Sequence, residues 1–151
     1  MMKTANKLLN VFSKTSTKRY YHLSFEELEN IKLIPRVPDN FLTRNGYEDN
    51  TTKRVCLSTS IEGCLKAMSQ NLKGKRLYVY SAELNVNDII VPTIDQVPDC
   101  KITGEVWLTK EITLPIYGIV DVHIAGRAHK YQYGNGNVAE LYSWNYKFTK
   151  V

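Results

Sequence analysis

Apolar and polar residues alternate with a period of two along most of this chain, which predicts a protein built mainly of β-strands. In the segment RLYVYSAEL the odd-numbered residues from Leu77 to Ser81 should occupy one face of a strand, and the even-numbered residues from Tyr78 to Ala82 the other. The pattern predicts strands over residues 19–23, 53–58, 76–84, 88–91, 104–112, 117–124 and 141–148.

Two segments carry helix signals instead. Ser60 begins a stretch whose apolar residues recur at helical spacing, and Gly74 should end it. A shorter helical turn is predicted where Glu27 follows the potential N-cap Ser24 by three residues. Turn formers crowd residues 34–50 and 92–103, so both are expected to be loops. Six or seven strands with one or two short helices predict an α+β fold.

Length and charge predict a leader followed by one domain. The chain has 151 residues, 43% hydrophobic and 23% charged, which suits a single globular domain and excludes a disordered or fibrous protein. Residues 1–19 carry five of the 20 basic side chains and no acid, and residues 20–151 carry the other 15 against 15 acids. We therefore expect a basic flexible or helical leader over 1–19 and one neutral domain over 20–151. A neutral domain argues against nucleic acid as a permanent binding partner.

Neither a membrane span nor a metal site is expected. No stretch approaches the roughly 18 apolar residues that a membrane-spanning helix needs. The three cysteines, Cys56, Cys64 and Cys100, show neither CxxC spacing nor a histidine at ligand spacing. An odd number of scattered cysteines favours a reducing compartment, and hence the cytoplasm.

Polar residues that are candidates for catalysis or binding lie at four places in or beside the predicted strands. They are His22, the hydroxyl triplet Ser58-Thr59-Ser60, the strand tyrosines Tyr78 and Tyr80, and Glu105. Each has a structural explanation when taken alone: a satisfied core histidine, a helix cap, a pair of core rings and a solvated strand end.

Taken in chain order, these residues resemble the ADP-ribosyltransferase superfamily over about residues 19–124. The resemblance rests on His22 in YHLS, on the triplet in LSTS, and on Glu105 at the head of GEVWLTKEITLPIYGIVDV. It implies a split, mostly antiparallel sheet with NAD held in the cleft. It also implies that NAD is a substrate whose ADP-ribose is moved to a macromolecule.

The resemblance further implies a role for each matching residue. His22 would hydrogen-bond NAD, and Ser58, Thr59 and Ser60 would shape the nicotinamide pocket. Glu105 would bond a hydroxyl of the nicotinamide ribose and stabilise the positive charge that develops when the glycosidic bond breaks.

Side-chain chemistry adds three candidate contacts with NAD. Tyr78 and Tyr80 are candidates to stack on the nicotinamide ring. Arg54 is a candidate to bind the pyrophosphate bidentately.

One departure from the family pattern concerns the acceptor of ADP-ribose. Family members that modify arginine carry an acid or amide two residues before the glutamate, and that position here is Thr103. Arginine is therefore a disfavoured acceptor, and a protein or a nucleic acid both remain open. The small size would suit an effector or toxin of a phage or mobile element that works in the host cell cytoplasm.

Two other function classes compete with this interpretation. The basic leader and the aromatic residues between Tyr131 and Phe148 could form a non-catalytic binding module for a protein or single-stranded nucleic acid. A metal-free hydrolase or nuclease would instead use His123 or His129, although no acid lies at a suitable spacing.

Overall fold

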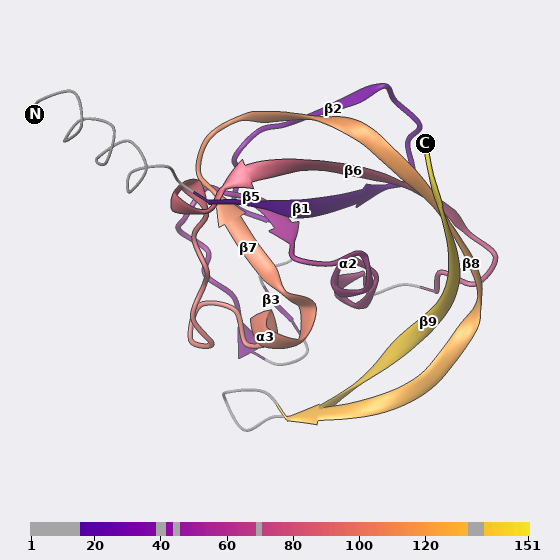
Figure 1. Cartoon of the computed structure of the whole chain (residues 1–151). Coiled ribbons are helices and arrows are strands. Elements are labelled where there is room, and N and C mark those ends of the chain that lie inside the picture. The colour runs from indigo at the N-terminus through magenta and orange to yellow at the C-terminus, as the bar shows by residue number, and fades with distance from the viewer. Residues whose placement is uncertain (1–15, 39–41, 44–45, 69–70, 133–137) are drawn as a thin grey trace, which may run out of the picture.

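The computed structural model describes residues 16–38, 42–43, 46–68, 71–132 and 138–151 (Figure 1). Within these ranges the main sheet has seven strands, every pairing is antiparallel, and two short α-helices accompany the sheet. The predicted α+β class is thus confirmed. The elements are β1 (Thr17–Ser24), β2 (Asn30–Leu33), β3 (Leu42–Thr43), β4 (Gly46–Tyr47), β5 (Val55–Ser58), α2 (Ile61–Ala67), β6 (Arg76–Asn85), the 3₁₀ helix η1 (Val86–Asp88), α3 (Cys100–Thr103), β7 (Glu105–Leu108), β8 (Ile112–Gln132) and β9 (Val138–Lys150).

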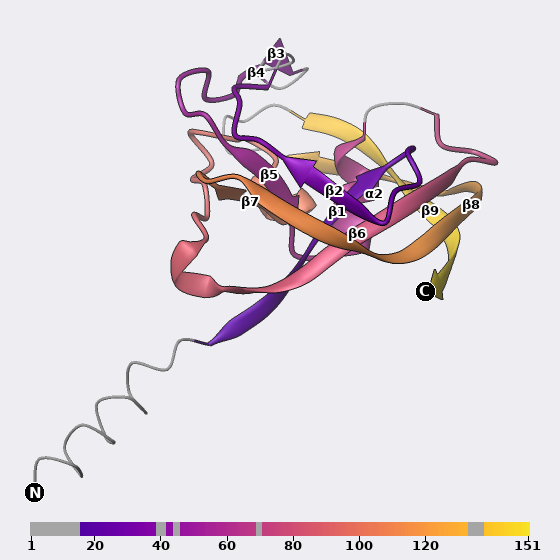
Figure 2. The same ribbon diagram turned by 90° about the horizontal axis from the view of Figure 1, so that it is seen from above.

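The strand order places β1 at the centre of the main sheet. The order is β2-β8-β6-β1-β5-β7, and β9 also pairs with β8. All eight residues of β1 pair with β6, whereas β1 and β5 share the single pair Tyr21 and Ser58. The sheet is therefore joined through one residue pair at this point. The short β3 and β4, which precede β5 in the chain, form a separate two-stranded sheet apart from the main sheet (Figure 2).

The two faces of the sheet carry different cores. On one face Tyr20, Val55 and Tyr80 belong to a cluster that also takes in Leu114 from β8. On the other face Leu77 and Val79 pack with residues of α2, β8 and β9, and the hairpin of β8 and β9 curls around α2 (Figure 1). The alternation predicted for residues 77–82 is therefore confirmed.

Helix α2 begins as the sequence predicts and ends earlier. The Ser60 hydroxyl accepts a hydrogen bond from the Gly63 backbone N–H at 2.9 Å, which caps the helix. The backbone is already extended at Met68, so the predicted end at Gly74 is wrong. Gly63 is required because a Cβ there would lie 2.0 Å from the carbonyl oxygen of Thr103, which precedes β7. This contact holds α2 directly against the start of β7.

The helical turn predicted after Ser24 does not form. The Ser24 hydroxyl accepts from the Glu26 backbone N–H in a tight turn, and residues 30–33 form β2 along β8. Ile31 and Leu33 alternate with exposed neighbours and pack against the first core. Burial with a period of two thus outweighed the local capping signal.

Further boundary errors lie around β7, and the strands predicted over 117–124 and 141–148 are parts of the longer β8 and β9. Residues 88–91 form the end of η1 and one bridge between Ile90 and Trp107, rather than a strand. The strand predicted over 104–112 is two strands, because β7 ends at Leu108 and β8 starts at Ile112. The predicted connector 92–103 contains α3, which ends at Gly104 with φ 68°.

Candidate functional site

A cavity of about 140 Å³ lies where β1 and β5 meet. His22, Ser58 and Glu105, which are far apart in the sequence, all line it. Its other lining residues are Tyr21, Leu23, Cys56, Leu57, Cys64, Ala67, Met68 and Thr103. The structure therefore brings together the three residues on which the sequence-based hypothesis depends.

The strand register explains this convergence. Tyr21 lies opposite Ser58, and Ser58 lies opposite Glu105, so one row of residues crosses β1, β5 and β7. Adjacent strands are about 4.8 Å apart, which puts Glu105 roughly 10 Å across the sheet from β1. His22 follows Tyr21 on β1 and reaches the cavity beside the single pair that joins β1 to β5.

Within the hydroxyl triplet, only Ser58 lines the cavity, and its hydroxyl is already bonded. Its Oγ donates to the Thr103 carbonyl at 2.7 Å and accepts from the Ser60 backbone N–H at 3.2 Å. Ser60 caps α2, and the Thr59 backbone N–H donates to the Gly104 carbonyl at 3.1 Å. The triplet thus builds the cavity wall by fixing β5, α2 and β7 together.

The carboxylate of Glu105 is fixed in position by a hydrogen bond. The indole N–H of Trp107 donates to its Oε2 at 2.8 Å. Burial raises the pKa of Glu105, the negative charge of Asp99 adds to this, and the Trp107 hydrogen bond opposes it. One carboxylate oxygen therefore has a fixed partner within β7.

His22 and the nearby thiols are uncharged. Burial lowers the pKa of His22, and a hydrogen bond with the Cys56 backbone opposes this, so the imidazole is neutral at pH 7 and keeps one ring nitrogen for another partner. Burial raises the pKa of Cys56 to about 11 and that of Cys64 to about 12. These thiols stay protonated and form an unreactive part of the wall.

Three predicted cofactor contacts lie away from the cavity. The Arg54 side chain is fully buried and donates to the carbonyls of Asp49 at 2.8 Å and Thr52 at 3.0 Å, so the structure does not support a pyrophosphate contact. Tyr80 is buried in the first core, where its hydroxyl donates to the Glu26 carbonyl, and Tyr78 packs against the same core. Neither tyrosine lines the cavity.

Tyr21 is the tyrosine that the sequence analysis missed. It lines the cavity, and its ring packs edge-on against Tyr117 with the centroids 6.1 Å apart. Its position beside His22 was visible in the sequence. Its pairing with Ser58 was not, because strand register between residues 37 positions apart has no local signal.

Glu48 is a second carboxyl group that the sequence analysis missed. Its Oε2 lies 3.5 Å from Nη2 of Arg54. Burial raises the pKa of Glu48 to about 7, and the charges of Glu105 and Asp99 add to the rise, whereas Arg54 opposes it. The negative charge of ionised Glu105 makes ionisation of Glu48 harder. The loop predicted over 34–50 thus carries a proton-binding group near the site, while its residues 39–41 and 44–45 lie outside the described ranges.

The cavity has the size of one planar ring. A cavity of about 150 Å³ accommodates benzene, whereas pockets that enclose a drug-sized ligand measure about 300–1,000 Å³. A nicotinamide ring fits this volume, and the rest of a dinucleotide would lie outside it. Among the residues that the structure describes, no group of three or more His, Cys, Asp or Glu side chains could hold a metal ion.

The residues of the two competing function classes are placed only in part. Trp144, Tyr146 and Phe148 are half-buried and pack against the second core, so they do not form an exposed stacking platform. His123 is exposed on β8. The leader residues 1–15 and the side chains of Tyr131, Tyr133, Tyr142 and His129 lie outside the described part of the structure.

The comparisons add no relative to this picture. No protein-family model, curated protein or solved structure matches the chain. In the part of the chain that the structure describes, none of the helices has both the length and the apolar character needed to cross a membrane.

Proposed function

We propose that this protein transfers ADP-ribose from NAD to a macromolecular acceptor, with Glu105 as the catalytic carboxylate. The observation that carries the proposal is the convergence of His22, Ser58 and Glu105 on one ring-sized cavity. In this proposal the nicotinamide ring occupies the cavity, Tyr21 supplies an aromatic wall, and His22 hydrogen-bonds the cofactor. The reaction takes place in the cytoplasm.

The proposed chemistry needs one carboxylate and a dry pocket. The bond between C1′ of the nicotinamide ribose and the ring nitrogen breaks, and its electron pair goes to nicotinamide, which leaves neutral. The acceptor's nucleophilic atom then bonds C1′ and loses a proton. Glu105 stabilises the positive charge that develops on the ribose, and half-burial makes this interaction stronger than it would be in water.

Release of nicotinamide from NAD is the first test. We expect Glu105→Gln to lower kcat by about a hundredfold or more, because the amide has the shape of the carboxylate without its charge. The matched control is Glu83→Gln on β6, an exposed glutamate that contacts Thr17 at 3.5 Å and does not line the cavity.

The control variant should turn over NAD at the wild-type rate. Both variants should show the wild-type urea unfolding transition within about 1 kcal/mol, since neither side chain is part of either core. Equal nicotinamide release by the wild-type protein and the folded Glu105→Gln variant would refute the proposal.

The residue two positions before Glu105 bears on the acceptor. Thr103 is buried and donates its hydroxyl to the Asp99 carbonyl, so this position offers no carboxylate to activate a guanidinium. We therefore propose an acceptor other than arginine, in a protein or a nucleic acid. Labelled NAD incubated with arginine-rich protein, hydroxyl-rich protein and single-stranded DNA separates these acceptors, and labelling confined to arginine would overturn this part.

A further inference from the structure

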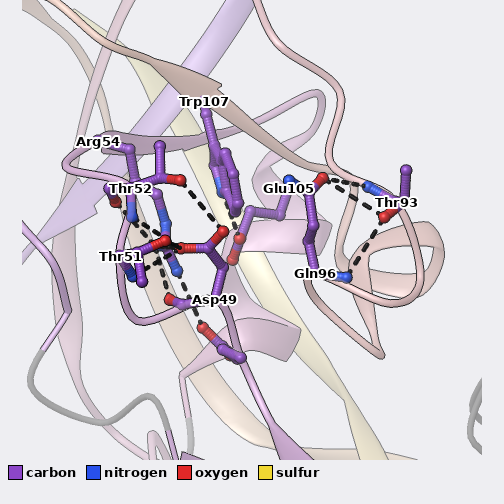
Figure 3. A network of polar contacts seen from close by, with 9 residues as sticks. Asp49, Thr51, Thr52, Arg54, Thr93, Gln96, Glu105 and Trp107 are labelled. Atoms are coloured by element: carbon purple, nitrogen blue, oxygen red, sulfur yellow. Dashed lines mark hydrogen bonds and ion pairs between the residues drawn. The ribbon is translucent and has the colours of Figure 1, made fainter.

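A chain of contacts connects Glu105 to the segment that precedes β5. Trp107 donates its indole N–H to Glu105, and the guanidinium carbon of Arg54 lies 4.2 Å from the centre of the Trp107 ring (Figure 3). Arg54 in turn binds the carbonyls of Asp49 and Thr52 and lies 3.5 Å from a Glu48 carboxylate oxygen. The chain runs from segment 48–52 through two buried side chains to the cavity.

Both intermediate side chains are enclosed by protein. Trp107 is 1% exposed and packs with Val97 and Cys100, and Arg54 is likewise 1% exposed. Residues two apart on a strand share a face, so Trp107 lies directly beside Glu105 on β7. A buried ring with a cation against its face cannot turn freely, and its N–H direction is therefore fixed.

We propose that Trp107 is a positioning residue that holds the Glu105 carboxylate toward the cavity, and that Arg54 fixes the indole from the other side. This inference rests on the proposed function. The indole N–H donates to Oε2, so Oε1 is the oxygen available to a ribose hydroxyl. The hydrogen bond also favours the charged form of the carboxylate, which is the form that stabilises the transition state.

Asp99 and Arg54 also influence the ionisation of Glu105, and further titratable groups surround it, so the test must isolate Trp107. His22 comes from β1, the other acidic and basic side chains from the segments that precede β5 and α3, and the thiols from β5 and α3. These groups are Asp99, Arg54, Glu48, His22, Cys56 and Cys100.

The indole signals of the full chain provide a test without NAD. The sequence has two tryptophans, Trp107 and Trp144, so a ¹⁵N-labelled protein gives two indole N–H signals, which Trp144→Phe assigns. On titration, the Trp107 signal should shift with a midpoint above the usual glutamate pKa of about 4.3, and the shift should vanish in Glu105→Gln. A Trp107 signal that does not titrate, or that titrates equally in Glu105→Gln, would overturn the inference.

Kinetics separate positioning from simple packing. Trp107→Phe keeps most of the ring and loses the donor, so kcat should fall about tenfold to a hundredfold with little change in KM. The acid limb of the pH profile should move to higher pH, because the hydrogen bond that lowers the Glu105 pKa is gone. The matched variant Trp144→Phe should keep the wild-type kcat and pH profile.

Together, the NMR titration and the kinetics distinguish the proposed ADP-ribose transfer from the proposed role of Trp107. If the Trp107 signal reports Glu105 ionisation but the wild-type protein releases no nicotinamide, the contact stands and the proposed function fails. If nicotinamide is released and the folded Trp107→Phe variant has an unchanged kcat and pH profile, the positioning role fails. Should Trp107→Phe not fold, the titration of the wild-type protein against Glu105→Gln still decides the inference.

Discussion

Ser58 shows that a cavity residue can be committed to structure before any ligand binds. Its hydroxyl donates to Thr103 and accepts from Ser60, so both of its ordinary bonding directions are in use. Glu105 differs, because only its Oε2 has a protein partner among the hydrogen bonds in the structure's described part. At the scale of single residues, Glu105 therefore keeps one carboxylate oxygen for a ligand, and His22, which bonds the Cys56 backbone, keeps one ring nitrogen.

Glu48 gives a prediction about stability and pH. Its pKa rises from 4.5 to about 7 on folding, so the folded state holds this proton more tightly than the unfolded state does. The associated stability is fully present below pH 4.5 and is lost as the pH rises through 7. Because Gln resembles the protonated acid, Glu48→Gln should match the wild-type protein near pH 4.5 and exceed its free energy of unfolding at pH 8 by roughly 2–3 kcal/mol.

Urea unfolding at several pH values measures this difference. The matched variant is again Glu83→Gln, whose difference from the wild-type protein should stay nearly constant between pH 5 and 8 because Glu83 is exposed. A Glu48→Gln variant that loses stability relative to the wild-type protein as the pH rises would show that the Arg54 ion pair outweighs burial.

At the scale of elements, the position of α2 depends on Gly63, because any side chain there would collide with its neighbours. A Cβ on Gly63 would lie 2.0 Å from the Thr103 carbonyl oxygen and 2.5 Å from the Ser58 hydroxyl. Alanine is the better helix former by about 1 kcal/mol, but the clash is with backbone and cannot be relieved by a rotamer change. Gly63→Ala should therefore destabilise the protein by about 1–3 kcal/mol.

Thermal unfolding measures the change, with Glu62→Ala as the control. Glu62 lies beside Gly63 on α2 and is exposed, so its replacement should change the free energy of unfolding by less than about 0.5 kcal/mol. Stabilisation by Gly63→Ala would mean that α2 does not sit tightly against the start of β7.

The elements also show which parts of the structure the sequence can predict. Strands such as β6 were predicted because one face packs on each core, and alternation therefore stays visible in the residues themselves. The strand β2 was missed because alternation over only four residues is a weaker signal in the sequence than the capping pattern before it, although the fold itself follows the alternation. For the site, His22, Ser58 and Glu105 were found through a motif order, whereas the partners of Arg54 and the cavity face of Tyr21 depend on register and folding of the loop.

At the scale of the whole molecule, the site depends on both halves of the main sheet. His22 comes from β1, which pairs along its full length with β6, and Glu105 comes from β7, which pairs with β5. The halves are joined in the ladder by Tyr21 and Ser58 alone and are held further by α2, which packs against both β1 and β5. The geometry of the cavity is thus a property of how the two halves are held together.

The two cores make a prediction about additivity. Val55 belongs to the core on one face and Val120 to the core on the other, and the strand order separates β5 from β8 by three spacings, roughly 14 Å. Each Val→Ala replacement should cost about 2 kcal/mol, from lost burial and the cavity it leaves. Because the valines share no core cluster, the double variant should lose the sum of the two within about 0.5 kcal/mol.

A second pair within one core serves as the comparison. Val79 and Val120 pack in the same cluster on neighbouring strands, so the cavities left by their truncation adjoin and the free energies should depart from additivity by more than about 0.5 kcal/mol. Urea unfolding of the three single and two double variants measures both cycles. Equal coupling in the two pairs would contradict two separate cores, and the sheet would then transmit packing changes from the face that carries α2 to the opposite face.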